Sequence, residues 1–287
     1  MKALKYTIFA VTIAMTSCVA NDETTERLAK FSAQVTPMNI VEVNDDESRG
    51  YVQILGSAGA MNFHYGWLAG ERISVYDGEQ SMANYNVLTT GTTCALTGSG
   101  FLLEPGKNYY AFSPYTKELN MSKVPVDYTG QNQSTNGNYS HLANYIYLYS
   151  TASGSTGDIT NFVFHHASSI LELQLSGLPA GTYKKLSIAT ESYIQKGTFD
   201  LSAHSATAIT PSSSGSIELS LGGESGITIS GGETLDVYVA VPAGTIGGGT
   251  KIFVTGDGSG MFSATINSQL SIGAGNIFLT RKTLTQI

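Results

Sequence analysis

The sequence predicts an all-β protein built from β-sandwiches, and three observations lead to that fold class. Short apolar runs alternate with turn residues along most of the chain, which is typical of many short strands. Glycine supplies 32 of the 287 residues, and 41% of the residues are hydrophobic, enough to bury a sizeable core. No window of about 11 or more residues keeps the 3.6-residue period of an amphipathic helix.

The charge balance excludes one broad class of function. Charged residues make up 13% of the chain, against roughly 25% in an ordinary globular protein. The 15 lysines and arginines stand against 22 aspartates and glutamates, so the formal net charge is −7. Nucleic-acid binding requires a basic surface, so we expect no nucleic-acid partner.

Residues 1–17 have the pattern of a secretory signal. Two lysines precede an apolar run at residues 8–15, which is too short for the roughly 20 residues of a bilayer span. The small residues before Cys18 resemble a bacterial lipobox, in which the cysteine is acylated and becomes the first residue of the mature chain. We expect lipidation at Cys18, and the alternative is an ordinary signal peptide that ends on a cysteine by chance.

The second cysteine, Cys94, would have no disulfide partner once Cys18 is acylated. It lies in a strand-like run, and we expect it to act as a small buried hydrophobe. Residues 18–30 are polar and charged, and we expect them to form a tether.

From residue 31 onward the pattern predicts about fifteen strands separated by glycine and other turn residues. In chain order they are expected at 31–35, 51–55, 72–76, 85–88, 93–97, 108–112, 143–149, 162–164, 170–175, 185–189, 217–221, 234–241, 251–255, 262–266 and 276–279. Regular strand and turn spacing of this kind predicts sandwiches.

The stretch at residues 149–158 is small, polar and rich in serine, threonine and glycine. It divides the chain after the tether into two nearly equal parts, each of the ordinary domain size of about 100–150 residues. We therefore predict one β-sandwich domain at 31–158 and a second at 159–287. The alternative is that the stretch is a long hairpin loop.

Catalytic and phosphate-binding motifs are missing from the sequence. It contains no His-Glu-x-x-His pair, no Gly-x-Ser-x-Gly elbow and no P-loop. The glycine-rich run at 256–260 is not followed by a helical pattern, so a β-turn explains it better than a phosphate site does. We expect no catalytic residue, no cofactor and no enzyme activity. An enzyme on a β scaffold is the weakest alternative, and it would require a pocket of converging carboxylates.

His165 and His166 are adjacent and invite a metal site. Neighbouring side chains of a strand point to opposite faces, so the two histidines cannot bind one ion together from a regular strand. We expect no metal site here, and alternation with Val163 and Ala167 predicts that His165 is the half-buried histidine.

Several tyrosines could stack on sugars, namely Tyr109, Tyr110, Tyr115, Tyr145, Tyr147 and Tyr149. The simpler interpretation is that alternating tyrosines are good strand residues, packed on one face and wet on the other.

Six short patterns occur in order along the chain. They are Trp-Leu-Ala-Gly-Glu-Arg-Ile-Ser-Val-Tyr at 67–76, Tyr-Tyr-Ala-Phe-Ser-Pro-Tyr at 109–115, Gln-Asn-Gln at 131–133, Phe-His-His-Ala at 164–167, Tyr-Val-Ala-Val-Pro at 238–242 and Ala-Gly-Asn at 274–276. Behind a lipobox, this series resembles the fimbrillin family, the type V pilins and their lipoprotein relatives. Glu71 departs from the pattern, because the family usually has aspartate there.

The resemblance implies two tandem transthyretin-like, Greek-key β-sandwiches behind a lipoprotein signal peptide. It also implies a structural subunit of a cell-surface fimbria that serves adhesion, carried to the outer membrane as a surface-exposed lipoprotein. In this family an Arg-specific protease cuts an exposed loop and the N-terminal strand leaves. A donor strand from a neighbouring fimbrial subunit then fills the groove. A receptor on a host or bacterial surface would be a further partner.

The bond between Arg49 and Gly50 is the predicted processing site. The chain has three other arginines: Arg72 and Arg281 fall in or near expected strands, and Arg27 precedes the first strand. The alternative is that Arg49 is an ordinary surface residue.

The strand that this cut would release carries Phe31, Ala33 and Val35, and it would leave together with the lipid anchor. Stalk pilins of the family donate extra C-terminal strands that often carry tryptophan, whereas the only tryptophan here is Trp67. We therefore expect a tip or accessory subunit, with an anchor as the alternative. A non-polymerising, glycan-binding surface lipoprotein is the hypothesis from another class.

Overall fold

The computed structural model describes residues 30–44, 51–54, 66–79, 81–98, 100–101, 104–154, 160–258 and 260–287. Within these residues the chain is all-β, as the sequence predicts. It has 22 strands and three short 3₁₀ helices, η1 (Met121–Lys123), η2 (Ser140–Asn144) and η3 (Leu201–Ala203). None of the helices in this part of the chain has the length and apolar character that a membrane crossing requires.

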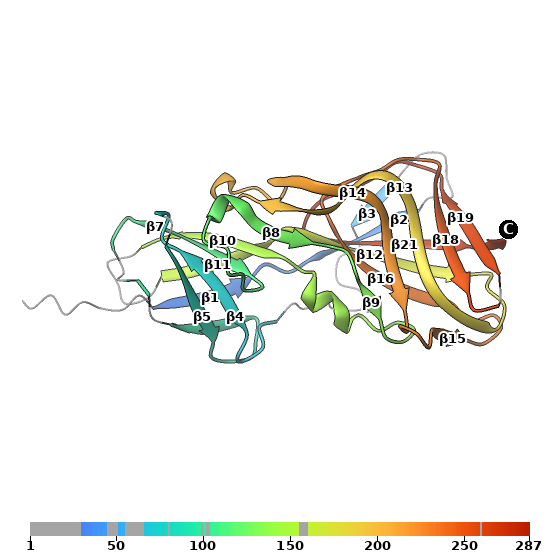
Figure 1. The fold of residues 1–287 in the computed structure, drawn as a ribbon, viewed down its shortest axis with the longest axis horizontal. Helices are drawn as coiled ribbons and strands as arrows, with labels where there is room; N and C mark the ends of the chain where they lie inside the picture. The colour runs from blue at the N-terminus through green and yellow to red at the C-terminus, as the bar shows by residue number, and fades with distance from the viewer. Residues whose placement is uncertain are drawn as a thin grey trace, which may run out of the picture.

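Seven strands close into one sheet around the first core (Figure 1). Their order is β1-β11-β10-β7-β4-β5-β6, and β6 pairs with β1 to complete the ring. The strands are β1 (Phe31–Val35), β4 (Arg72–Tyr76), β5 (Met82–Val87), β6 (Thr93–Gly98), β7 (Asn108–Ser113), β10 (Leu148–Ser153) and β11 (Thr160–His166). The interior contains many aromatic rings, including Trp67, Tyr109, Phe112 and Phe164.

Two other sheets enclose the second core. The five-stranded sheet has the order β16-β12-β21-β2-β3, with β2 (Asn39–Asn44), β3 (Tyr51–Ile54), β12 (Ser168–Ser176), β16 (Leu235–Pro242) and β21 (Asn276–Thr283). The eight-stranded sheet follows β22-β19-β18-β13-β14-β9, while β8 and β15 also pair with β13. Its members are β8 (Val124–Asp127), β9 (Asn132–Gln133), β13 (Gly181–Phe199), β14 (Ile209–Leu221), β15 (Ile227–Ile229), β18 (Thr250–Gly256), β19 (Met261–Ile266) and β22 (Thr285–Gln286). A small sheet pairs β17 (Gly244–Ile246) with β20 (Leu270–Ile272).

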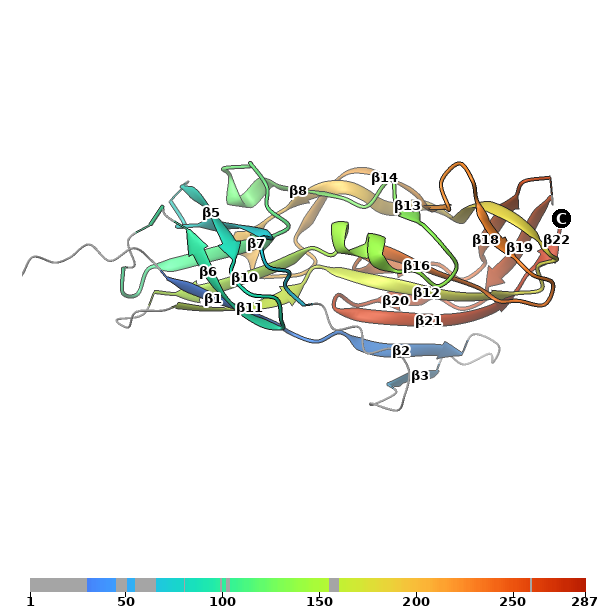
Figure 2. The same ribbon diagram turned by 90° about the horizontal axis from the view of Figure 1, so that it is seen from below.

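The molecule is elongated, with the closed sheet at one end and β18, β19 and the C-terminus at the other (Figures 1 and 2). Strand β13 is 19 residues long and reaches both cores. Its Leu186 packs in the second core and its Phe199 in the first. One continuous strand therefore contributes side chains to both cores.

The strand expected at residues 143–149 is wrong in its first half, because η2 occupies Ser140–Asn144 and β10 begins only at Leu148. The backbone N–H of Ile146 donates to the Leu142 carbonyl at 3.0 Å, as in a helical turn, and both side chains are buried. Their spacing of four residues suits a turn that packs one side against the core. The sequence pattern also misses β2 altogether, whose place depends on pairing with the distant β21.

The predicted division between residues 158 and 159 remains a proposal. Strands β10 and β11 flank that point, and they pair antiparallel within the same closed sheet, with Leu148 opposite His166. The chain then passes through Ala167 directly into β12 of the five-stranded sheet. If the chain has two domains, this pairing favours a boundary at Ala167.

Two buried glutamines satisfy the outer edge of β16. The side-chain amide of Gln131 donates to the Ala240 carbonyl at 2.7 Å and accepts from the Ala240 N–H at 2.8 Å. Gln133 donates to the Asp236 carbonyl at 2.7 Å and accepts from the Tyr238 N–H at 2.9 Å. Each side chain thus takes the place of a strand partner on an edge that would otherwise stay unpaired.

We expect Gln133→Met to lower the free energy of unfolding, because it leaves the Tyr238 N–H without its acceptor, while the Asp236 carbonyl keeps the Gly137 N–H at 3.0 Å. A buried unsatisfied group costs about 1–3 kcal/mol. Urea unfolding would measure the loss, with the exposed neighbour changed in Ser134→Ala as the control. A loss within about 0.5 kcal/mol, the range of ordinary surface substitutions, would contradict this role.

Candidate functional site: the first strand and its groove

Strand β1 lies between two other strands and completes the closed sheet. It pairs in parallel with β11, where Ala33 is opposite Phe162, and antiparallel with β6, where Ala33 is opposite Cys94. At its start, the Thr160 N–H donates to the Lys30 carbonyl at 3.0 Å. Both hydrogen-bonding edges of β1 are used, so its removal would leave an unpaired edge on each neighbour.

The inward face of β1 carries Phe31, Ala33 and Val35, whose exposed fractions are 1%, 1% and 7%. The ring centroid of Phe31 lies 4.9 Å from that of Phe162 and 5.1 Å from that of Tyr85. Full burial of such a ring contributes about 1.5–3 kcal/mol, and each aromatic pair adds about 0.5–1.5 kcal/mol. The expected strand at 31–35 is confirmed, while its displacement remains a prediction.

The end of β1 is held by hydrogen bonds to β11. The hydroxyl and the N–H of Thr36 both donate to the Phe164 carbonyl, at 2.6 and 3.0 Å. Nε2 of His166 lies 2.9 Å from the Thr36 carbonyl, so the proton is assigned to this nitrogen, which donates. The imidazole is 5% exposed, and burial lowers the pKa of His166 to about 4.

The segment that follows β1 enters the second core. The Asn39 N–H donates to the Gly275 carbonyl at 3.1 Å, and β2 then pairs in parallel with β21 and antiparallel with β3. Val41 of β2 is buried among residues of the second core. Residues 31–44 therefore supply one strand to each core, as the blue ribbon of β1 and β2 shows in Figure 2.

Cys94 is a free, buried cysteine on β6, as the sequence predicts. It lies opposite Ala33 of β1, and burial raises the pKa of the thiol to about 11. Burial and the raised pKa both disfavour the reactive thiolate while β1 covers this site. Its reactivity would report directly whether β1 is in place.

The prediction that His165 is the half-buried histidine is wrong, because His166 is the buried one. Strand β11 points Phe162, Phe164 and His166 inward, whereas Val163 and His165 face outward. Phenylalanines at alternate positions set the register, and a shift by one residue exchanges the two faces of a strand. The histidine that matters for β1 is thus His166.

The tyrosines considered for sugar stacking serve mainly in packing. Tyr109 and Tyr147 are buried, and the other four, Tyr110, Tyr115, Tyr145 and Tyr149, are half-buried. The Tyr147 hydroxyl donates to the Asp127 carbonyl at 2.9 Å, an internal bond between β8 and the segment before β10. Tyr109, Tyr110 and Tyr149 lie in strands, as the strand interpretation expects, whereas Tyr115, Tyr145 and Tyr147 lie outside strands.

Three predicted site residues, Cys18, Arg49 and Gly50, lie outside the described residues. In the sequence, Arg49 and Gly50 lie between Asn44 and Tyr51, which are paired across β2 and β3. In the part of the chain that the structure describes, no group of three or more side chains that could ligate a metal comes together.

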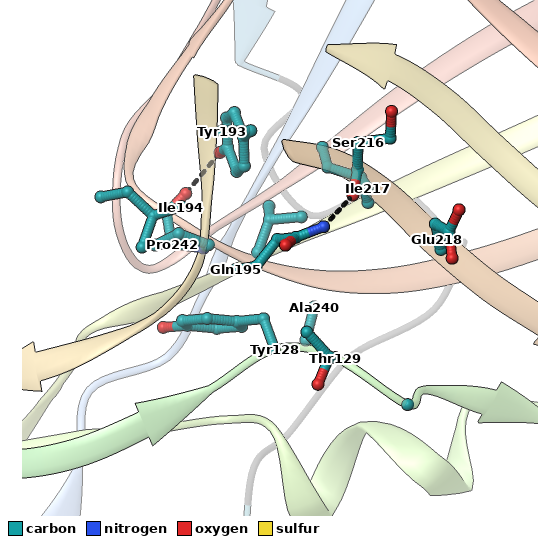
Figure 3. Close-up of a pocket in the computed structure, with 12 residues that line it drawn as sticks. Tyr128, Thr129, Tyr193, Ile194, Gln195, Ser216, Ile217, Glu218, Ala240 and Pro242 are labelled. Carbon is teal, nitrogen blue, oxygen red and sulfur yellow. Dashed lines mark hydrogen bonds between the residues drawn. The ribbon is translucent and has the colours of Figure 1, made fainter. Parts of the chain in front are cut away.

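A small pocket lies where β13 and β14 pass between the two cores (Figure 3). Tyr128 of the first core and Tyr193 of the second line it, and its volume is about 60 Å³. The Tyr193 hydroxyl donates to the Pro242 carbonyl at 2.5 Å, and the Gln195 amide donates to the Ser216 carbonyl at 2.8 Å. A few waters at about 30 Å³ each would fill this space, whereas ligand pockets begin near 300 Å³.

A family model described as fimbrillin-like matches residues 62–286. Among solved structures, the chain is similar to a Bacteroides ovatus protein described as a cell adhesion protein, with 13% identity, a TM-score of 0.55, and coverage of 91% of this chain and 96% of that one. A Bacteroides uniformis protein with the same description gives 16% identity, a TM-score of 0.55, and coverage of 86% and 92%. Likeness at these identities shows the fold. Among curated proteins, no sequence matches the chain.

We expect Phe31→Ala to lower the free energy of unfolding by about 3–5 kcal/mol, because the change removes a buried ring and leaves a cavity between three aromatic side chains. Gln34→Ala, on the exposed face of the same strand, is the matched control. Urea unfolding measures both variants. Equal losses for the two variants would show that the groove does not depend on Phe31.

We expect acid to weaken the fold through His166. In the unfolded chain this histidine binds a proton near pH 6.5, and in the folded chain only near pH 4. The stability that depends on its neutral form is complete above about pH 6.5, is lost as the pH falls toward 4, and amounts to about 3 kcal/mol at most.

Urea unfolding at about pH 7 and about pH 4.5 would test this dependence. The His166→Gln variant should lose less stability on acidification than the parent chain does. The outward-facing His165→Gln variant should lose as much as the parent. An unchanged acid loss in His166→Gln would contradict the assignment.

Proposed function

Since the chain belongs to the fimbrillin-like family, we propose that it enters a cell-surface fimbria by exchanging its own first strand for a strand of a neighbouring subunit. The observation that carries this proposal is the environment of β1. This strand is paired on both sides and buries Phe31, Ala33 and Val35 in the first core. A strand with the same pairing and burial could replace it, which is β-augmentation.

The groove left by β1 would favour binding of another strand. Without β1, the facing edges of β6 and β11 lose their ladder partners, and the rings of Tyr85, Tyr109 and Phe162 lose their contact with Phe31. Apolar burial contributes about 25 cal/mol per Å², so an incoming strand regains both hydrogen bonds and buried area. A donor strand should therefore place large apolar side chains at alternate positions.

Cleavage by an Arg-specific protease between Arg49 and Gly50 would begin the exchange. In the sequence this bond follows β2, so the released piece would contain β1 and β2 together. Arg72 and Arg281 belong to β4 and β21, where a protease would first have to open the sheet. The neighbour's strand would then have two places to fill, one in each core.

The remaining parts of the proposal concern location and role. Acylation of Cys18 would anchor the unprocessed chain at the outer membrane, exposed at the cell surface. Leu284 is buried in the second core and β22 pairs with β19, so these C-terminal residues serve the chain's own fold. The role that we propose is that of a tip or accessory subunit, which accepts a strand and would meet a receptor on a host or bacterial surface.

Arg-specific digestion of the chain that begins after Cys18 would test the exchange. We expect a new N-terminus at Gly50, followed by alkylation of Cys94 once residues up to 49 have left. Arg49→Lys should keep both the bond and the buried thiol intact. Digestion that leaves Arg49–Gly50 whole, or cleavage after which Cys94 stays unreactive, would contradict the proposal.

Strand capture is the second part of this test. A synthetic peptide of residues 30–44 should bind the digested protein and protect Cys94 again. A control peptide with serine at positions 31, 33 and 35 should not protect the thiol, because it cannot refill the apolar groove.

A further inference from the structure

Strand β3 depends on β2 for its place in the five-stranded sheet. The order of that sheet is β16-β12-β21-β2-β3, so β2 lies between β21 and β3 (Figure 2). Among the described residues, β3 is paired with no other strand. A cut between Arg49 and Gly50 would release β2 together with β1, whereas β3 follows the cut and stays with the chain. The release would therefore separate β3 from its partner.

The same release would open one edge of β21. Strand β2 pairs in parallel with β21 over residues 39–43, while β12 pairs with the other side of β21 and stays in place. Val41 of β2 is 6% exposed and belongs to the second core, so the loss of β2 would also uncover that core. An open edge beside a bare core favours any strand that restores both hydrogen bonds and apolar burial.

The register of β3 matches the place that β2 would leave. Ile54 of β3 is opposite Val41 of β2, and Val52 is opposite Val43. Residues that are directly opposite each other in an antiparallel pair lie on the same face of the sheet. If β3 moved sideways by one strand spacing, about 4.8 Å, Ile54 would take the register position that Val41 holds now. An isoleucine at that position would restore the apolar burial that Val41 supplies.

Strand direction and chain length both permit this movement. Strand β3 is antiparallel to β2, and β2 is parallel to β21, so β3 would be antiparallel to β21. An antiparallel pair is at least as stable per residue as a parallel pair. In the sequence, residues 55–65 connect β3 to Gly66, and an extended chain of this length spans about 30 Å or more, far beyond one strand spacing.

We propose that β3 moves into the place of β2 once β1 and β2 have left, and that it completes the second core from within the chain. This inference rests on the proposed strand exchange and specifies the partner. Of the two places that the release would open, the neighbour's strand would need to fill only the groove of β1, where Phe31, Ala33 and Val35 are buried. A donor segment about as long as the five residues of β1, apolar at alternate positions, would be sufficient.

The test uses a cut that does not depend on Arg-specific cleavage. In the chain that begins after Cys18, the recognition sequence of a site-specific protease replaces residues 45–50. The cut chain is unfolded in urea, the piece that carries β1 and β2 is removed, and the remainder is refolded by dilution with one of two synthetic peptides. The short peptide, residues 30–37, can fill the groove of β1 alone, and the long peptide, residues 30–44, can fill both places.

We expect the remainder to bind the short peptide within about threefold of its affinity for the long one, because β3 occupies the second place. Protection of Cys94 from alkylation measures both affinities, since this thiol lies opposite Ala33 of β1. Ile54→Asn should favour the long peptide at least about tenfold, because burial of an amide without a partner opposes the movement of β3. Gln53→Asn, at the next position of the same strand, is the matched control and should behave like the parent.

A cysteine pair detects the movement directly. In the intact chain Gln53 is opposite Glu42, which is opposite Leu279, so about two strand spacings, or roughly 9–10 Å, separate Gln53 from Leu279. A disulfide requires Cα atoms within about 7 Å of each other. In a Cys94→Ser background, Gln53→Cys/Leu279→Cys should therefore form a disulfide under mild oxidation in the remainder bound to the short peptide, and should stay reduced in the intact chain.

The outcomes separate this inference from strand exchange itself. If the parent remainder prefers the long peptide by tenfold or more, or if the cysteine pair stays reduced with the short peptide bound, the movement of β3 is overturned while strand exchange stands. Failure to refold with either peptide would overturn both. The affinity comparison on the parent requires no substitution in β3 or β21, so it decides the question even if the cysteine variant does not fold.

Discussion

Strand edges are the physical constraint on which the rest of this structure depends. A buried backbone N–H or carbonyl without a partner costs about 1–3 kcal/mol, so every edge that faces a core must be satisfied. The fold does this in three ways. The first sheet closes on itself through β1, the outer edge of β16 receives the amides of Gln131 and Gln133, and β19 receives the short strand β22.

Among these solutions, β1 differs because it is the first of the described strands and completes the closed sheet. Strands β2 and β3 of another sheet separate it in sequence from β4, the next strand of the closed sheet. The other strands of that sheet lie further along the chain, between later elements. A cut after β2 would detach β1 without severing the connections among those strands. The closed sheet thus depends on β1 for two strand pairings, yet a single cut after β2 separates β1 from the rest of the chain. This is the physical basis for proposing strand exchange in a fimbrillin-like protein.

Local pattern was enough to predict the all-β class and most of the strands, including the strand at 31–35, because alternation and turn residues act within a few positions of the chain. It did not place β2 or choose the inward histidine, because these depend on pairing with strands elsewhere.

By itself, the sequence determined which segments would extend, because alternation and turn residues are local chemistry. The tertiary structure decided which distant residues would meet. Gln131 bonds to Ala240, 109 positions away, and Phe31 packs against Phe162, 131 positions away. Such meetings depend on the packing of sheets around the two cores, which no short stretch of sequence encodes.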